Sequence, residues 1–138
     1  MRYCTRILEI DLGHRVYKHE GQCSRMHGHR IKVEVEACND ELDSVGRVID
    51  YSVLKQICGG WLDSNWDHRF LVYEKDEELA HLSASLGRVT VPFNPTSENI
   101  AQFLFVRFNE LMGEYRIAIT RVRVYETPSC YAEYSVED

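Results

Sequence analysis

The hydrophobic and polar positions of this chain alternate most clearly over residues 29–38. Apolar side chains occupy every second position there, and charged side chains occupy most of the positions between them. Successive side chains of a strand point to opposite faces, so this alternation predicts a strand with one buried face. The apolar face comprises Ile31, Val33, Val35 and Ala37, and the polar face comprises Arg30, Lys32, Glu34 and Glu36.

Weaker alternation predicts three further strands, over residues 3–12, 117–126 and 131–136. Residues 15–26 are polar and irregular, which indicates a loop between the first two strands. A short extended segment is expected at residues 90–92.

Helical spacing of apolar residues predicts a helix over residues 51–63, with Asp50 as its N-cap. The pair Gly59-Gly60 opposes this helix by about 1 kcal/mol per glycine relative to alanine. The pattern breaks over residues 65–71, and a short helix is expected within residues 75–86.

A second long helix is predicted to begin at residues 95–98, where a Thr or Ser cap is followed by an acidic residue in the first turn. Its apolar stripe continues to Leu111, and Gly113 ends it. The main elements therefore follow the order strand, strand, helix, helix, strand, strand. This order favours an α+β fold with an antiparallel sheet and two helices on one face.

The length of 138 residues is typical of one domain, spanning residues 1–138. The formal net charge of -6 argues against nucleic acid as a partner, since phosphate binding requires concentrated Lys and Arg. No apolar run approaches the roughly 20 residues of a membrane helix. The five cysteines are odd in number and lack Cys-x-x-Cys spacing, which together with the absence of a signal-like segment predicts a cytoplasmic location.

Residues 23–29 hold three groups that can bind or act beside a metal: Cys23, His27 and His29. The two histidines are two positions apart on a predicted strand, so both imidazoles can point at one ion. His14 ends the first predicted strand and becomes a third ligand if the two strands pair as a hairpin. A catalytic zinc usually takes three protein ligands and leaves one position open. Cys23 is then either a fourth ligand or a free nucleophile or base, although an isolated His-x-His is more often a surface or packing feature.

Five ordered segments resemble the 6-pyruvoyl-tetrahydropterin synthase family, and most closely its bacterial 6-carboxy-tetrahydropterin synthase branch. The first is Cys23-x-x-x-His27-Gly28-His29, with His14 upstream. The others are Gly46-Arg47-Val48-Ile49-Asp50-Tyr51, Asp67-His68-x-x-Leu71, Pro95-Thr96-Ser97-Glu98-Asn99 and Val124-Tyr125-Glu126-Thr127. The chain departs from the family pattern at Gly13, where Ala or Ser is frequent, at Trp66, where Leu is common, and at Val72, where Asn is usual.

The resemblance implies a tunnelling fold, with a four-stranded antiparallel sheet and two helices, assembled into a homohexamer with sites between subunits. It implies that Zn²⁺ is bound by His14, His27 and His29, and that Cys23 is a catalytic thiol with Asp67 and His68 as partners. It also implies that Glu126 anchors the pterin ring and that Thr96, Ser97 and Glu98 lie on the pterin side. Without the family, Asp67-His68 reads as a helix-exit turn, Glu126 as a solvated strand-end acid, and residues 96–98 as a helix cap.

The expected reaction is conversion of 7,8-dihydroneopterin triphosphate to 6-carboxy-5,6,7,8-tetrahydropterin, acetaldehyde and triphosphate, as in queuosine synthesis. Three alternatives are open: elimination that stops at 6-pyruvoyl-tetrahydropterin, a non-catalytic zinc- or pterin-binding module, and a purely structural α+β protein without stoichiometric zinc. The three-residue gap between Cys23 and His27 favours the carboxy-pterin branch. Candidates for holding the triphosphate, by charge and proximity, are Lys18, Arg25, Arg30 and Lys32.

Overall fold

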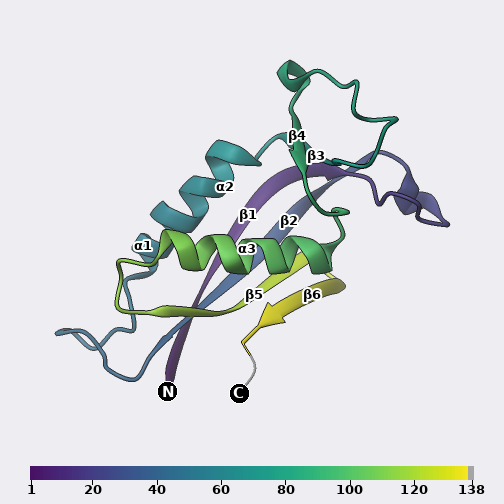
Figure 1. Cartoon of the computed structure of the whole chain (residues 1–138). Coiled ribbons are helices and arrows are strands. Elements are labelled where there is room, and N and C mark those ends of the chain that lie inside the picture. Colours follow the sequence, from purple (N-terminus) through teal and green to yellow (C-terminus); the bar gives the residue numbers. More distant parts are fainter. Residues whose placement is uncertain (137–138) are drawn as a thin grey trace.

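A long antiparallel hairpin forms the centre of the fold, which we describe for residues 1–136 from a computed structural model. Strands β1 (Arg2–His14) and β2 (His27–Asn39) pair over their whole length, from Arg2 opposite Asn39 to His14 opposite His27. Figure 1 shows both strands running diagonally through the molecule, with their connecting loop at one end. The predicted strands 3–12 and 29–38 are confirmed, each extended by a few residues.

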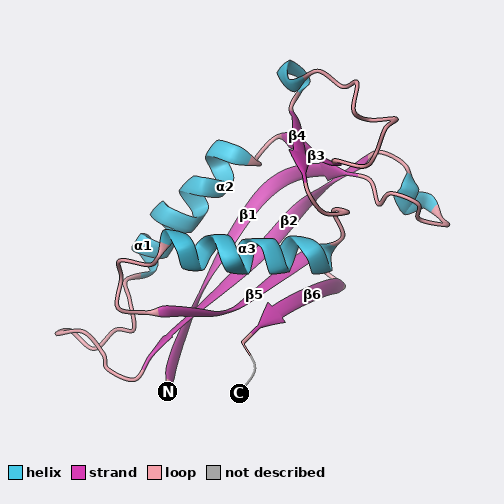
Figure 2. Ribbon diagram, in the orientation of Figure 1, coloured by secondary structure: helices cyan, strands magenta, loops and turns pink. Residues whose placement is uncertain are grey.

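The hairpin belongs to a six-stranded sheet with the order β4-β3-β1-β2-β5-β6. Strands β5 (Ala118–Thr127) and β6 (Cys130–Ser135) continue the antiparallel side beyond β2 and confirm the two predicted C-terminal strands. On the other side, β3 (Arg69–Tyr73) and β4 (Arg88–Val91) lie parallel to β1 and to each other. Figure 2 shows these two short strands at the end of the sheet where β1 finishes.

The expectation of a four-stranded, wholly antiparallel sheet is therefore wrong. Strand β3 has the sequence Arg-Phe-Leu-Val-Tyr, a nearly continuous apolar run that carries no alternation. Such runs are typical of parallel strands that are covered on both faces, and periodicity alone does not identify them. Strand β4 includes residues 90 and 91 of the segment expected to be extended at 90–92, and it ends before Pro92.

The short helix expected within residues 75–86 is also absent from the described structure, except for a single 3-10 turn at Ala84–Leu86. Asp76 provides the physical reason, since its side chain is 1% exposed and accepts two hydrogen bonds from the Arg15 guanidinium, at 2.7 and 2.5 Å. This ion pair holds the segment against the end of β1 and replaces local helical hydrogen bonds as the feature that shapes it.

The predicted helix over residues 51–63 is confirmed as α1 (Tyr51–Leu54), a π-helical turn (Lys55–Gly59) and α2 (Gly60–Asn65) in unbroken succession. Asp50 caps it by accepting the Ser52 backbone N–H at 2.9 Å. Gly59 allows the helix to approach the sheet closely, because a Cβ added there would lie 3.1 Å from Cδ2 of Leu8. Close packing against β1 thus offsets the low helix propensity of this glycine.

Helix α3 (Ser97–Leu111) confirms the second predicted helix. Thr96 is its N-cap, and the Thr96 hydroxyl accepts the Asn99 backbone N–H at 3.2 Å. Figures 1 and 2 show α2 and α3 lying side by side in front of the sheet, which confirms two helices on one face.

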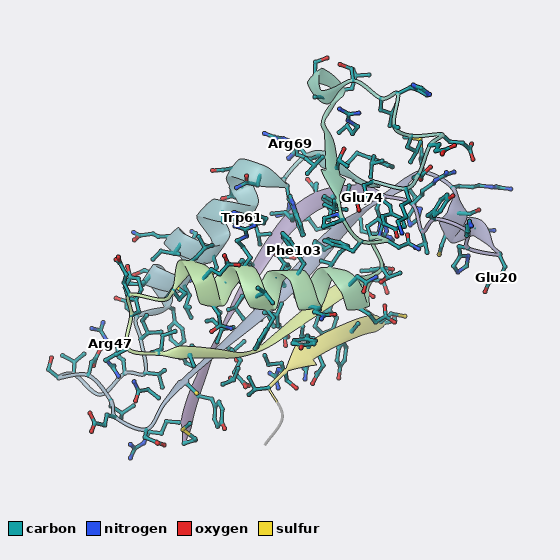
Figure 3. The ribbon with its side chains drawn as sticks, viewed as in Figure 1. Glu20, Arg47, Trp61, Arg69, Glu74 and Phe103 are labelled. Atoms are coloured by element: carbon teal, nitrogen blue, oxygen red, sulfur yellow. The ribbon has the colours of Figure 1, made fainter. Side chains whose placement is uncertain are left out.

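The main core lies between these helices and the inner face of the sheet. The inner face consists of the alternate positions that include Leu8, Ile10 and Leu12 of β1 and Ile31, Val33, Val35 and Ala37 of β2. An aromatic cluster joins the two helices: Figure 3 shows Trp61 and Phe103 between them, and Trp66 stacks on Phe103 with ring centroids 5.5 Å apart. Trp66, which departs from the family pattern, fills this cluster and is 2% exposed.

The outer face of the sheet is polar and carries cross-strand ion pairs, among them Arg121–Glu36 at 3.2 Å and Arg123–Glu34 at 3.4 Å. Among residues 1–136, the longest helices are too short or too polar to cross a bilayer.

Candidate metal centre

Three histidines converge at the end of the central hairpin. His14 is the last residue of β1 and lies directly opposite His27 of β2, and His29 follows two positions along the same face of β2. All three side chains therefore continue the inner face of the sheet beyond the apolar core. Their ring centroids lie 4.6 to 5.2 Å apart, and their ligand nitrogens lie within 4.8 Å of one another.

Two backbone carbonyls orient the rings. Nδ1 of His14 lies 2.6 Å from the Pro95 carbonyl oxygen, and Nδ1 of His27 lies 2.6 Å from the Arg25 carbonyl oxygen. A carbonyl can only accept, so in each ring Nδ1 carries the proton and Nε2 presents a lone pair. A backbone carbonyl on the distal nitrogen is the usual second partner of a metal-bound histidine.

Nε2 of His14 and Nε2 of His29 are buried and have no hydrogen-bond partner within residues 1–136. Buried nitrogens of this kind normally have a partner, and a metal ion would supply one. Burial lowers the pKa of both His14 and His29, which keeps the imidazoles neutral near pH 7, as metal binding requires. The three residues thus fit a tetrahedral Zn²⁺ site with one open position.

Glu126 lies on the open side of this cluster, near the end of β5. Its carboxylate oxygens are 3.8 Å from Nε2 of His14 and 4.0 Å from Nε2 of His29, beyond direct hydrogen bonding. The side chain is 26% exposed, so the carboxylate borders both the histidines and solvent. Glu126 can therefore face a ligand that approaches the metal position.

Cys23 lies in a short 3-10 turn, Gln22–Ser24, within the loop whose tip is marked by Glu20 in Figure 3. It lines a cavity of about 430 Å³ that is also lined by His27 and His29. Among the described residues, the group whose ligand atoms lie within 4.8 Å of one another here consists of His14, His27 and His29, and Cys23 does not belong to it. The thiol therefore stands beside the histidine cluster and borders the same space.

Asp67 and His68 lie close together beside the edge of β1, and the His68 ring extends towards the side chain of Asp11, on the face opposite the three histidines. Nδ1 of His68 is 3.0 Å from Oδ2 of Asp67, and Nε2 of His68 is 3.6 Å from Oδ2 of Asp11. The Asp11 side chain points away from the inner face that carries His14, because the two residues are three positions apart on one strand. Within one chain, the structure thus brings together the three histidines, Cys23 and Glu126, and places Asp67 and His68 elsewhere.

The segment before α3 touches the histidine cluster through its backbone, since Pro95 is the partner of His14. Thr96 and Glu98 keep the roles expected of a helix start, with the Thr96 hydroxyl capping the helix and Glu98 accepting from the Ser97 hydroxyl at 3.1 Å. The helix-cap interpretation of residues 96–98 and their expected place on the pterin side are both compatible with the structure, because a capping residue can also border a ligand.

Sequence reasoning missed the residues that fix this segment to the hairpin. The Asn94 amide pairs with the backbone of Tyr17 in both directions, at 2.8 and 3.0 Å, and the Asn99 amide donates to the Asn94 carbonyl at 2.9 Å. The Asn94-Pro95 dipeptide, a turn signal, could have pointed to this junction.

The four candidates for holding triphosphate are divided by the fold. Arg30 and Lys32 point to the face opposite the histidines, where Arg30 pairs with Asp11 at 3.3 Å and Lys32 lies 4.1 Å above the Tyr125 ring. Arg25 lines the Cys23 cavity, and Lys18 is exposed in the same loop. Only Lys18 and Arg25 therefore lie on the loop that borders the histidine cluster of this chain.

Known proteins resemble this chain over nearly its whole length. The family model described as 6-pyruvoyl tetrahydropterin synthase matches residues 3–137. A protein of Rickettsia bellii named 6-carboxy-5,6,7,8-tetrahydropterin synthase is 34% identical, covering 94% of this chain and 97% of that protein. A Haemophilus influenzae protein of the same name is 35% identical, covering 94% and 96%.

Solved structures share the fold. An uncharacterized protein of Wolinella succinogenes superimposes with a TM-score of 0.85 at 23% identity, covering 99% of this chain and 98% of that one. The 6-pyruvoyl tetrahydropterin synthase of Caenorhabditis elegans superimposes with a TM-score of 0.72, also at 23% identity, covering 99% and 96%. Together with the family model and the curated relatives, the converging histidines lead to one conclusion: the chain belongs to the 6-pyruvoyl tetrahydropterin synthase family.

Proposed function

We propose that this protein is a zinc-dependent lyase that converts 7,8-dihydroneopterin triphosphate to 6-carboxy-5,6,7,8-tetrahydropterin, acetaldehyde and triphosphate, a step of queuosine and 7-deazaguanine synthesis. The observation that carries the proposal is the cluster of His14, His27 and His29, in which two buried Nε2 atoms lack a hydrogen-bond partner within residues 1–136. The names of the curated relatives support the carboxy-pterin product.

In this proposal His14, His27 and His29 hold the zinc. A bound Zn²⁺ would supply a Lewis acid that binds the vicinal hydroxyls of the substrate side chain. The Pro95 and Arg25 carbonyls fix the His14 and His27 rings, so that the ligand nitrogens are oriented before an ion arrives.

Cys23 is the proposed base, because its thiol borders the space beside His27 and His29 and a thiolate near a cation can take a proton. Asp67 and His68 are its proposed partners in proton transfer, with Asp67 holding the proton at Nδ1 of His68. In one chain Cys23 borders the histidine cluster, whereas the His68 ring lies beside Asp11 on the opposite face of the sheet. We therefore place the complete site between subunits of a homohexamer, where Cys23 of one subunit can meet Asp67 and His68 of another. The hexamer and a cytoplasmic location stay predictions.

Glu126 is the proposed anchor of the pterin ring. A pterin presents an N–H and an amino group side by side, and a carboxylate accepts both as a bidentate pair. The position of Glu126 on the open side of the histidine cluster supports this role, because the ring must lie next to the side chain that reaches the metal. The start of α3, with Thr96, Ser97 and Glu98, is the proposed second border of the pterin.

The alternative enzyme stops at 6-pyruvoyl-tetrahydropterin. The family model bears that name, and the short gap between Cys23 and His27 is the feature that favours the carboxy-pterin product instead. Mass spectrometry of a reaction with dihydroneopterin triphosphate separates the two. Acetaldehyde and the carboxy-pterin are expected, and a pyruvoyl product without acetaldehyde would refute the assignment.

Replacing Cys23 by alanine tests catalysis against a closed structural site. We expect Cys23→Ala to lose turnover while it retains zinc and its fold. Loss of both zinc and folded structure would instead identify Cys23 as a fourth ligand of a non-catalytic module. Cys130→Ala, which removes an exposed thiol elsewhere, is the matched control and should change neither property.

A further inference from the structure

The imidazole of His68 lies between two carboxylates, and only one of them belongs to the proposed catalytic pair. Asp67 faces Nδ1 at 3.0 Å, and Asp11 faces Nε2 at 3.6 Å. We propose that Asp11 is a positioning residue that acts through His68, by orienting its imidazole ring. This inference rests on the proposed function, in which His68 transfers a proton.

The backbone of Asp11 also binds both Asp67 and His68. The Asp11 N–H donates to Oδ1 of Asp67 at 2.9 Å, and the His68 N–H donates to the Asp11 carbonyl at 2.8 Å. His68 has a φ of 59°, a left-handed conformation that is uncommon for residues other than glycine. These two hydrogen bonds tie the turn of Asp67 and His68 to one residue of β1, so the contact between Asp11 and the ring follows from the fold.

The two carboxylates, and not packing, determine the orientation of the His68 ring. The His68 side chain is 75% exposed, so packing does not hold it. The other charged groups nearby are Arg30, which pairs with Asp11 at 3.3 Å, and Arg69, which donates to the Ser64 carbonyl at 3.4 Å. Figure 3 labels Arg69 at the start of β3. Arg30 thus orients the Asp11 carboxylate and leaves its second oxygen on the side of His68.

The two carboxylates have different effects on the ring. Asp67 lies 3.0 Å from Nδ1 of His68 and holds a proton there. Burial acts to raise the pKa of Asp67, but the hydrogen bond from the Asp11 N–H and the contact with His68 lower it overall, so this carboxyl stays ionised. Asp11 lies 3.6 Å from Nε2, at the opposite end of the ring from Asp67. The two carboxylates together therefore define the direction in which the exposed ring points, and Asp11 positions Nε2.

Turnover of dihydroneopterin triphosphate by the zinc-loaded full-length protein tests the inference. In Asp11→Asn we expect kcat to fall roughly tenfold, less than the roughly hundredfold or greater loss from removing a general acid or base itself. KM and zinc content should not change, and Asp11→Glu should recover part of kcat. Glu9→Gln, on the same face of β1, is the matched control and should keep wild-type kcat.

A double variant separates this role from a structural one. If Asp11 acts only through the ring, Asp11→Asn combined with His68→Asn should be no slower than His68→Asn alone. Asparagine suits the His68 position because it tolerates positive φ. Additive losses, or an equal loss in Glu9→Gln, would overturn the inference. So would a second bound zinc that disappears in Asp11→Asn, because the cluster would then be a metal site.

A chemical measurement tests the same contact without turnover. Diethyl pyrocarbonate modifies accessible imidazole nitrogens, and peptide mass spectrometry measures the rate at His68, where Asp11 lies beside Nε2. We expect this rate to rise several-fold in Asp11→Asn and to stay unchanged in Glu9→Gln, whereas equal rates in Asp11→Asn and wild type would refute the role of Asp11. If the wild type does not act on the pterin but the rate still responds to Asp11, the proposed function fails and the placement of Asp11 holds.

Discussion

Gly13 precedes the first histidine of the candidate metal centre, and the structure gives a physical reason for the absence of a side chain there. A Cβ added at Gly13 would lie 2.5 Å from Cδ2 and 3.0 Å from Cε2 of Phe70, the second residue of β3. Carbon atoms in contact are normally about 3.5–4.0 Å apart. In Gly13→Ala the Phe70 ring, or the end of β1, must therefore move by about 1 Å.

The cost of such overpacking is about 1–3 kcal/mol in the free energy of unfolding. Phe70 is only partly buried, so part of the strain can be relieved by movement of its ring. The remaining strain falls on the backbone beside His14. A displaced ligand should weaken zinc binding, by about tenfold if the effect matches that of removing a partner which orients a ligand.

Urea denaturation of Gly13→Ala, Phe70→Ala and the double variant measures the conflict directly. Phe70→Ala removes all three ring atoms that the new methyl group would meet, so Gly13→Ala should cost little in that background. The coupling free energy should therefore be about 1–3 kcal/mol in favour of the double variant. Gly60→Ala is the control, because its new Cβ meets nothing within 4 Å and should stabilise the helix by about 0.5–1 kcal/mol.

The reasoning would be refuted if Gly13→Ala were as stable as wild type with unchanged zinc affinity. It would also be refuted if the losses from Gly13→Ala and Phe70→Ala were simply additive, since the cost would then not arise from contact between the two side chains.

Three further predictions concern an ion pair, a thiol and the metal ligands. Asp76→Ala should lower the free energy of unfolding by about 3–5 kcal/mol, because it leaves the charge of Arg15 without its buried partner. Glu78→Ala removes an exposed partner of the same arginine and should cost under about 1 kcal/mol. Urea titrations measure both. Burial raises the pKa of Cys58 from its ordinary value of 9.0 to about 12. The neutral thiol therefore makes its full contribution to the free energy of unfolding below pH 9, and this contribution is lost as the pH rises towards 12. Between pH 9 and 11 the wild type should lose about 2–3 kcal/mol more than Cys58→Ala, and parallel curves for the two proteins would contradict this. His14→Ala should lose stoichiometric zinc in metal analysis while His81→Ala, an exposed histidine outside the cluster, retains it; equal zinc in both would exclude the proposed ligands.

Local patterns predicted much of the fold because they report local geometry. Alternation over residues 29–38 identified β2 and the face it buries, and the Thr96 cap identified the start of α3. The same alternation placed His27 and His29 on one face, and the hairpin with β1 then brought His14 opposite His27. The candidate metal centre follows from strand periodicity together with a single pairing.

Long-range contacts determined what the patterns missed. Strand β3 has no alternation, and its pairing with β1 extends only from Leu12 to His14, so only the folded chain identifies it. Residues 75–86 have enough apolar spacing to suggest a helix, but the buried pair of Arg15 and Asp76 joins positions 61 residues apart and holds them in another shape.

The sequence by itself therefore determined the family, the strand that carries two of the three histidines, and the capped helix whose preceding carbonyl orients the third. Only the tertiary structure decided that the His68 ring lies on the face of the sheet opposite the three histidines, and that Asp11 faces the second nitrogen of His68. The physical reason is that side-chain periodicity specifies a face within one strand. Which residues meet across that face depends on strand order, register and the turn at His68, and these are set by contacts between distant parts of the chain.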